Sequence, residues 1–295
     1  MRGKLYLLIG NPPFQCDHYL GIAITDLSWP IMNNVAPDEI WLFLRELANI
    51  AAQETLPRFR LGGEVQNKIE GEGFDPVTEA DRQAECALRQ AIKERFPSHG
   101  IVGEEFGETL GASEWCWILD PIDGTRSYIS GMPTWGTLIG LLKDNVPIYG
   151  MMSQPFVGDC FIGGNGRAQL VRLEGVTDLK SRIGITIDEA TLFSTTPEMF
   201  ELGDELDSFQ RVSRKTKLTR FGADCYGYCL LAAGFVDLVL EANLGYYDIA
   251  PMIPIIESSG GVVTDWEGRP LRSGGRALAA ASAELHNSVL NLLHS

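Results

Sequence analysis

Two carboxylates three residues apart, Asp120 and Asp123, follow an apolar run in the segment Trp117-Ile-Leu-Asp-Pro-Ile-Asp-Gly-Thr125. Pro121 fixes one backbone angle, and Gly124 permits a sharp exit from a strand. We therefore expect both acids to lie on a rigid turn at the end of a strand, where they can converge with carbonyl oxygens on one ion. Hard cations such as Mg²⁺ prefer this all-oxygen environment.

This pair of acids has other interpretations when it is taken alone. An Asp-Pro followed by an Asp-Gly is often only a turn. The segment also compares with the Asp-x-Asp-Gly-Thr nucleophile loop of haloacid-dehalogenase-type phosphatases, but there the acids are two positions apart and here they are three apart. A histidine-paired nucleophile fits poorly, because the four histidines lie in the N-terminal arm, a turn or the tail. The Gly-rich stretch at residues 163–166 is better interpreted as a hairpin turn than as a nucleotide loop.

Further acids occur at the ends of other predicted elements. Gly103-Glu104-Glu105 ends a short strand that begins at Gly100, and the stretch from Asp75 to Asp81 opens a helix. Tyr247-Asp248-Ile249-Ala250 opens a late helix. These positions predict a metal cluster made by five acids: Glu104, Asp120, Asp123, Asp248 and Asp81.

The elements that must position these acids divide into an extension and two units. Residues 1–36 fit the rest poorly and are interpreted as a flexible N-terminal extension. Helical spacing of apolar residues predicts helices from Pro37 to about Ala51 and from Glu79 to Phe96. Strands are predicted at residues 100–103, 115–119, 137–142 and 148–152. Residues 37–188 are therefore expected to form an α+β unit that binds the metals.

The pattern changes near Ala190, after which strands and helices alternate. Strands are predicted at residues 191–194, 236–241 and 260–265, and helices at residues 224–233 and 248–258. Residues 195–198 also carry a helix-start signature. Such alternation predicts a layered α/β unit over residues 189–295, which would complete the active site.

Composition restricts the partners. The chain has 295 residues and a formal net charge of −15, which argues against nucleic acid or an acidic membrane surface. No stretch approaches the ~20 apolar residues of a membrane helix. The six cysteines contain no Cys-x-x-Cys pair, and this spacing is typical of reduced thiols in a cytoplasmic protein. The acidity is compatible with a small phosphorylated metabolite as the partner, because bound cations would supply the positive charge that an anionic substrate needs.

Taken together, these motifs resemble the inositol monophosphatase superfamily of metal-dependent, lithium-sensitive phosphatases. The matching segments occur in family order: 75–81, 103–105, 117–125, 247–250 and 257–265. The resemblance implies a layered αβαβα sandwich, usually dimeric, with the active site between the two units. It also implies that the chain is a hydrolase with two to three Mg²⁺ ions per site.

The resemblance assigns roles residue by residue. Glu104, Asp120 and the backbone carbonyl of Ile122 would hold a first metal, and Asp120, Asp123 and Asp248 a second. Asp81 would support a third metal through water and orient Thr125. The two ions would clamp the phosphoryl group and lower the pKa of a bound water. Thr125, with Asp81 and Glu104, would position that water for in-line attack.

Details of several stretches are more similar to the bacterial histidinol-phosphate phosphatases of this superfamily. The stretches are residues 124–128, 131–136, 224–228 and 263–268, and Tyr247 replaces a tryptophan common in inositol phosphatases. The predicted reaction is hydrolysis of L-histidinol phosphate to L-histidinol and phosphate, in histidine biosynthesis. Residues expected to contact the substrate are Gly124, Thr125, Arg126, Asp224, Glu241 and Asp248.

Alternatives stay open at this point. Asp224 could be a helix cap, Glu241 a solvated strand end, and Arg126 part of a surface salt bridge. Inositol 1-phosphate or another sugar phosphate is the nearest alternative substrate. A 3′-phosphoadenosine-type nucleotide is a weaker one, and so is a binding module with little catalytic activity.

Overall fold

Two amphipathic helices open the part of the chain that the computed structural model describes, namely residues 37–62, 65–68 and 76–295. Helix α1 spans Pro37–Thr55, and α2 spans Glu79–Arg95. Thr78 caps α2, and the Asp81 carboxylate accepts the Thr78 N–H, which completes a capping box. The predicted extension at residues 1–36 and the predicted motif residue Asp75 lie outside these described residues.

An eight-stranded sheet packs against these two helices and runs in the order β10-β9-β8-β7-β6-β5-β3-β4. Only β3 and β5 pair in parallel among its neighbouring strands. A separate short ribbon pairs β1 (Val65–Asn67) with β2 (Pro76–Thr78). The sheet strands are β3 (Gly100–Gly103), β4 (Gly107–Thr109), β5 (Trp115–Asp123), β6 (Gly136–Lys143), β7 (Val146–Gln154), β8 (Asp159–Gly164), β9 (Arg167–Arg172) and β10 (Gly175–Asp178).

Strand β5 differs from the prediction in a way that matters for the site. It does not end at Leu119 but continues through Asp123. Its register with β6 shifts between Asp120 and Asp123, because the strand bulges there. A bulge re-aims side chains that would otherwise alternate across the sheet, so both acids are presented at one end of β5.

A second, five-stranded sheet runs in the order β12-β11-β13-β15-β14. Strand β11 is parallel to both of its neighbours, and the other pairs are antiparallel. The strands are β11 (Thr191–Ser194), β12 (Leu218–Phe221), β13 (Leu238–Leu244), β14 (Val262–Thr264) and β15 (Gly275–Ala280). The described residues from Pro37 onward belong to one compact unit. The boundary predicted at residue 189 stays a prediction.

The later helices are α3 (Thr125–Ser130), α4 (Asp204–Ser213), α5 (Tyr226–Ala232), α6 (Tyr246–Ile249), α7 (Met252–Ser259) and α8 (Ala283–Leu293), with short 3₁₀ turns at Leu56–Arg58 and Pro197–Met199. The single helix predicted over residues 248–258 is therefore two helices. Pro251 lies at the start of α7, where its missing N–H and fixed φ favour a new helix over continuation of α6.

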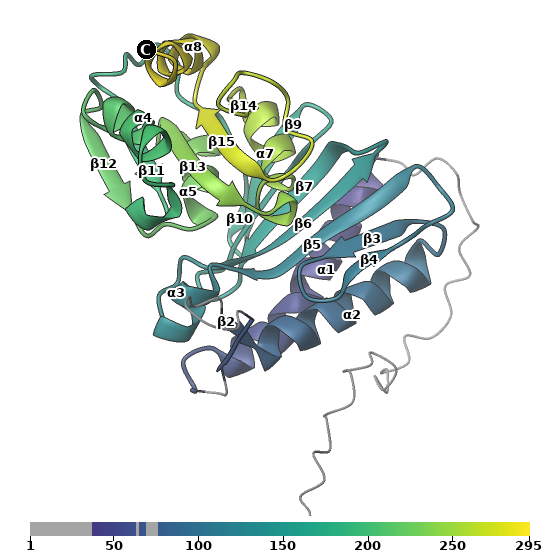
Figure 1. Ribbon diagram of the computed structural model, residues 1–295. Helices are drawn as coiled ribbons and strands as arrows, with labels where there is room; N and C mark the ends of the chain where they lie inside the picture. The colour runs from purple at the N-terminus through teal and green to yellow at the C-terminus, as the bar shows by residue number, and fades with distance from the viewer. Residues whose placement is uncertain (1–36, 63–64, 69–75) are drawn as a thin grey trace, which may run out of the picture. The chain divides into compact units, whose positions relative to one another are not determined.

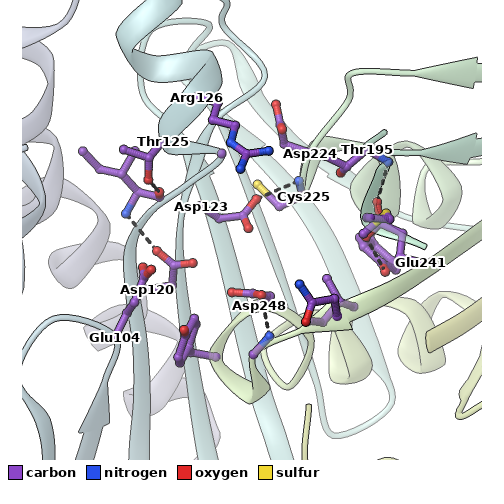
Figure 2. A pocket seen from close by; sticks show the side chains of 18 of the residues that line it. Glu104, Asp120, Asp123, Thr125, Arg126, Thr195, Asp224, Cys225, Glu241 and Asp248 are labelled. Carbon is purple, nitrogen blue, oxygen red and sulfur yellow. Dashed lines mark hydrogen bonds between the residues drawn. The ribbon is translucent and has the colours of Figure 1, made fainter. Parts of the chain in front are cut away.

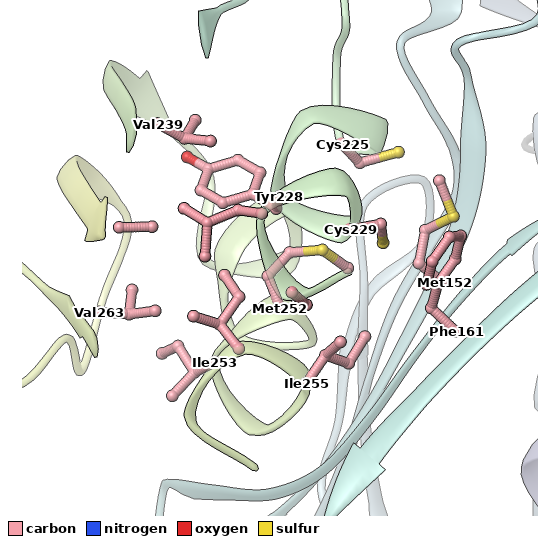
Figure 3. Packing of buried hydrophobic residues seen from close by; sticks show 14 of the residues in the cluster. Met152, Phe161, Cys225, Tyr228, Cys229, Val239, Met252, Ile253, Ile255 and Val263 are labelled. Carbon is pink, nitrogen blue, oxygen red and sulfur yellow. The ribbon is translucent and has the colours of Figure 1, made fainter. Parts of the chain in front are cut away.

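The layers follow from what each helix packs against. Helices α5 and α7 lie between the two sheets (Figure 1) and form one apolar cluster with the large sheet, in which Cys229 and Ile255 approach Phe161 (Figure 3). The outer faces are covered by α1 and α2 on the large sheet and by α4 and α8 on the small one. This arrangement confirms the predicted layered αβαβα sandwich.

Close packing of α7 on the large sheet requires glycine on the sheet. A Cβ atom at Gly150 would lie 1.8 Å from the carbonyl oxygen of Pro251, and one at Gly163 would lie 2.3 Å from the Cα of Ile255. Any side chain at either position would push α7, and with it the adjoining helix α6 that carries Asp248, away from the sheet.

Two sequence predictions about the environment of the chain can be compared with these residues. Cys116, Cys160, Cys225 and Cys229 are free thiols. Cys86 is disulfide-bonded, so the prediction of reduced cysteines is wrong for this residue. None of the helices in the described ranges is long and apolar enough to span a membrane.

Candidate functional site

A pocket of about 490 Å³ opens where the end of β5 meets the carboxyl end of β13 and helix α6. It is lined by ten of the eleven residues that the sequence predicts for the site. The eleventh, Asp81, does not line the pocket. The ten are Glu104, Asp120, Ile122, Asp123, Gly124, Thr125, Arg126, Asp224, Glu241 and Asp248.

Three carboxylates converge at the centre of this pocket. Oxygen atoms of Asp120, Asp123 and Asp248 all lie within 4.8 Å of one another (Figure 2). Each carboxylate is fixed by a backbone N–H: Asp120 by that of Ile122 at 3.0 Å, Asp123 by that of Cys225 at 2.8 Å, and Asp248 by that of Gly245 at 2.8 Å. The cluster is therefore built from strand β5 and helix α6 and held in place by the main chain.

The three acids repel one another in a buried environment. Burial, then the charges of Glu104 and Asp123, raises the pKa of Asp120 well above its usual range. Burial and the charge of Asp248 do the same to the pKa of Asp123. Burial and the charge of Glu104 raise the pKa of Asp248 to about 7. A site with this much unbalanced negative charge is suited to a divalent cation.

Glu104 follows β3 and lies beside Asp120 at the edge of the cluster (Figure 2). The Lys68 ammonium lies 2.9 Å from a Glu104 oxygen and 2.5 Å from a Glu105 oxygen. Burial raises the pKa of Glu105 to about 7, against the opposing effect of Lys68. Lys68 is a charged neighbour of the site that the sequence did not indicate, because it lies 36 residues before Glu104 in a segment without a motif.

Asp81 contributes an unusual buried oxygen near the pocket. Its Oδ2 accepts the Thr78 N–H at 2.8 Å and the Thr78 hydroxyl at 2.5 Å. Its Oδ1 is buried without a hydrogen-bond partner among the residues that the structure describes. Burial raises the pKa of Asp81 to about 6. A water or cation would satisfy this oxygen.

Thr125 begins helix α3 directly after the bulge. Its hydroxyl donates to the backbone carbonyl of Ile122 at 3.1 Å. The left-handed conformation of Gly124 folds the chain back so that Thr125 reaches this carbonyl three residues earlier. The hydrogen bond therefore fixes the position of the Thr125 hydroxyl relative to the Ile122 carbonyl. The orienting role that the resemblance gave to Asp81 stays a prediction.

Glu241 is not a solvated strand end, since its side chain is buried in β13. Its Oε1 accepts the Thr195 N–H at 2.7 Å, and its Oε2 accepts the Tyr228 hydroxyl at 2.9 Å. Burial raises the pKa of Glu241 to about 7, although both hydrogen bonds lower it. The carboxylate lines the pocket but stands apart from the three clustered aspartates (Figure 2).

Asp224 is not the cap of α5, whose N-cap position is Cys225. Its backbone is left-handed, with φ of 47°, which is uncommon outside glycine. Its Oδ2 accepts the hydroxyls of Ser127 at 2.5 Å and Thr134 at 2.6 Å. These contacts join the α5 loop to α3 and hold the Asp224 carboxylate at the pocket wall, directed away from Asp123 (Figure 2).

The side chain of Arg126 points into the pocket toward Asp123 (Figure 2). It is the one guanidinium among the residues that line the pocket. Other lining residues that sequence reasoning missed are Thr195, Tyr228 and Asn243. Tyr228 lay within a stretch noted for its similarity to histidinol-phosphate phosphatases, but nothing local indicated that its hydroxyl would reach Glu241.

Comparison with known proteins agrees with this architecture. The sequence profile of the Inositol monophosphatase family matches residues 36–295. The chain is 39% identical over 236 residues to "Bifunctional phosphatase IMPL2, chloroplastic" of Arabidopsis thaliana, covering 76% of this chain and 67% of the relative. It is 30% identical over 261 residues to a histidinol-phosphatase of Mycobacterium tuberculosis, covering 88% and 98%. A solved inositol monophosphatase structure from Zymomonas mobilis superposes with a TM-score of 0.77 at 33% identity, covering 89% and 100%.

Proposed function

Because this chain belongs to the inositol monophosphatase family of phosphoric monoester hydrolases, we propose that it hydrolyses L-histidinol phosphate to L-histidinol and phosphate, with Mg²⁺ as cofactor. The family is metal-dependent. The observation that carries the substrate proposal is Glu241, a buried carboxylate on the pocket wall that is separate from the clustered aspartates.

The acid cluster fits divalent cations on two observations. Its three carboxylates converge within 4.8 Å, and Asp81 Oδ1 lacks a partner among the described residues. In the proposal, Glu104, Asp120 and the Ile122 carbonyl hold one Mg²⁺, and Asp120, Asp123 and Asp248 a second. Asp81 supports a third through water. Bound divalent cations supply charge neutralisation for the phosphoryl group and a lowered pKa for an attacking water.

The remaining chemistry belongs to residues of the chain itself. Thr125, held by the Ile122 carbonyl, is proposed to orient the attacking water together with Asp81 and Glu104. The new bond forms between the water oxygen and phosphorus, and the bond from phosphorus to the ester oxygen breaks on the opposite side. The leaving alkoxide ends with one proton of the attacking water and becomes an alcohol, and the other proton of that water stays on the released phosphate. Gly124 and Arg126 are proposed to contact the phosphate.

The substrate proposal follows from the charge of the leaving group. Histidinol carries an amine and an imidazole, whereas inositol carries only hydroxyls. The oxygens of this buried carboxylate already accept two hydrogen bonds. Its negative charge therefore favours a cationic group of the substrate over one more neutral hydroxyl. Asp224, fixed by Ser127 and Thr134, is proposed to assist at the same end of the substrate. The relatives named histidinol-phosphatase support this choice.

A phosphate-release assay tests the proposal. Histidinol phosphate, inositol 1-phosphate, fructose 1,6-bisphosphate, 3′-phosphoadenosine 5′-phosphate and an aryl phosphate would be compared by kcat/KM at saturating Mg²⁺. We expect histidinol phosphate to have the highest value. A preference for inositol 1-phosphate would leave the phosphatase assignment intact and refute the substrate. Turnover that survives removal of divalent cations by EDTA would refute the metal proposal.

Three further proposals come from the sequence and the family. The chain is proposed to form a homodimer, to act in the cytoplasm, and to divide into units at residues 37–188 and 189–295. Light scattering would test the first, since a monomeric mass at assay concentrations contradicts it.

A further inference from the structure

Two buried charged side chains of helix α2 form hydrogen bonds with the turn that carries Glu104. This turn joins β3 to β4 and contains Glu104, Glu105 and Phe106. Helix α2 runs beside it (Figure 1) and places Glu85 and Arg89 against it. Glu85 is 0% exposed and Arg89 is 5% exposed. Neither side chain lines the pocket.

Glu85 binds the backbone of the two residues that follow Glu104. Its Oε2 accepts the Glu105 N–H at 2.8 Å, and its Oε1 accepts the Phe106 N–H at 3.2 Å. Because these amides adjoin Glu104, the carboxylate of Glu85 restrains the peptide units from which the Glu104 side chain projects.

Arg89 holds both Glu85 and the far side of the same turn. Its Nε donates to Glu85 Oε1 at 2.7 Å, and its Nη1 donates to the Thr109 hydroxyl at 3.1 Å. Its Nη2 donates to the carbonyl of Gly107. The planar guanidinium therefore ties the acid, the end of the turn and β4 together in one fixed arrangement.

The space under the turn is completely taken by this pair. A Cβ atom on Gly103, the residue before Glu104, would lie 2.0 Å from Glu85 Oε1 and 2.8 Å from Arg89 Nη2. Glycine at this position lets the buried charges approach the backbone directly. The close fit indicates that the position of the turn depends on Glu85 and Arg89.

A gain in folding stability alone does not explain why Glu85 and Arg89 form a buried ion pair. A buried ion pair contributes little more than two well-packed apolar residues would, since desolvation offsets the attraction. Its contacts, however, are directed at the neighbours of Glu104. Asp81 lies one helical turn before Glu85 on α2 and so faces the same region. Helix α2 thus carries one acid proposed for the metal site and the support of another.

We propose that Glu85 and Arg89 are positioning residues that fix the Glu104 turn and thereby set the affinity of the divalent cation at Glu104. This inference rests on the proposed function, which gives Glu104 to a metal. Partners that orient metal ligands without touching the metal typically change metal affinity or activity by about 10- to 100-fold when removed.

The test measures cation binding directly. Mn²⁺ would be titrated into the protein while the electron paramagnetic resonance signal of free Mn²⁺ is recorded. Glu85→Gln keeps the side-chain volume but loses the charge and one acceptor, and we expect the Mn²⁺ affinity to fall about 10- to 100-fold. Turnover of an aryl phosphate should recover at high Mg²⁺, because no group that meets the substrate has changed.

Asp237→Asn is the matched control. Asp237 is another buried acid that accepts a backbone N–H, that of Thr191 at 2.8 Å, and pairs with Arg182. It does not line the pocket. The control should lower the melting temperature without weakening Mn²⁺ binding. Equal losses of affinity in both variants, or unchanged affinity in Glu85→Gln, would overturn the positioning role.

Two further variants keep the test decisive. If Glu85→Gln does not fold, Arg89→Lys preserves the charge next to Glu85 but removes the fork that holds Gly107 and Thr109. A smaller loss of Mn²⁺ affinity is then expected, and an unchanged affinity refutes the proposal. Glu104→Gln distinguishes failure of the positioning role of Glu85 from failure of the metal assignment of Glu104. If Glu104→Gln weakens binding and Glu85→Gln does not, only the positioning role fails. If Glu104→Gln leaves binding unchanged, the metal assignment of Glu104 fails and the positioning role fails with it.

Discussion

Replacing Glu241 by glutamine should reduce selectivity for histidinol phosphate far more than it reduces general phosphatase activity. Glutamine keeps the volume of the side chain and one oxygen that can accept the Thr195 N–H. It removes the negative charge from a group with an exposure of 3%. The perturbation is therefore mainly electrostatic, and the acid cluster with its own backbone bonds should be preserved.

The magnitude follows from the burial of the carboxylate. Two unit charges about 4 Å apart attract by about 4 kcal/mol at an effective dielectric constant of about 20. Removing one partner of a buried charged contact typically costs about 2–5 kcal/mol. Since burial raises the pKa of Glu241 to about 7, part of the population is protonated at neutral pH, and this reduces the expected effect. We expect kcat/KM for histidinol phosphate to fall roughly 10- to 1,000-fold.

The pH dependence gives an independent check of the same reasoning. Only the ionised carboxylate attracts a cation, and burial raises the pKa of Glu241 to about 7. The ratio of wild-type to Glu241→Gln kcat/KM should therefore increase as pH rises from about 6 to about 8. Taking the ratio at each pH cancels the titration of the substrate phosphate, which affects both proteins alike.

The assay compares histidinol phosphate with an aryl phosphate in the wild type, Glu241→Gln and Asp237→Asn. Asp237 is a close control, because it lies four residues before Glu241, is buried, and also accepts a backbone N–H. Parallel loss of both activities in Glu241→Gln would mean that Glu241 supports the fold or the metal site, and it would refute the recognition of a cation.

Three other outcomes are expected. Asp120→Asn or Asp123→Asn should abolish turnover in a folded protein, because metal-assisted charge stabilisation contributes several kcal/mol; near wild-type kinetics at moderate Mg²⁺ would contradict the cluster assignment. Thr125→Ala should lower kcat much more than it raises KM if the hydroxyl orients water, and a change in KM alone would contradict this role. Lithium should inhibit more strongly as substrate increases, and full activity at tens of millimolar lithium, an order-of-magnitude choice for a weakly held hard cation, would count against a site of the family type.

The convergence of Asp120, Asp123 and Asp248 could be expected from the sequence, because each of these acids carries a local signal. Asp120 and Asp123 adjoin Pro121 and Gly124, and Asp248 opens a helix after a strand. Local signals of this kind place residues at the ends of elements, and the layered fold brings such ends together. The structure accordingly brings the three acids within 4.8 Å of one another.

Contacts that depend on distant partners could not be predicted in this way. The hydroxyls that hold Asp224 lie 90 and 97 residues earlier in the chain. These two hydrogen bonds help to hold Asp224 in its left-handed backbone conformation. Likewise, the sequence marks Glu85 only as a polar position on a predicted helix. Its role depends on contacts with the backbone of the turn after β3, about 20 residues later. The strand end was misplaced for a related reason, since the bulge in β5 is defined by its register with β6.

The acid cluster is also the place where the end of β5 meets the start of α5 and helix α6, and this links folding to metal binding. Asp123 at the end of β5 accepts the N–H of Cys225, 102 residues away beside α5, while Asp248 reaches the same centre from α6. The fold thus holds three carboxylates together, and burial first, then the charges of neighbouring carboxylates, raise their pKa values. A cation that binds only the folded protein stabilises it by about 2.7 kcal/mol at 100 times its dissociation constant. The ligand that the proposed chemistry needs would therefore also offset the electrostatic cost of building the site.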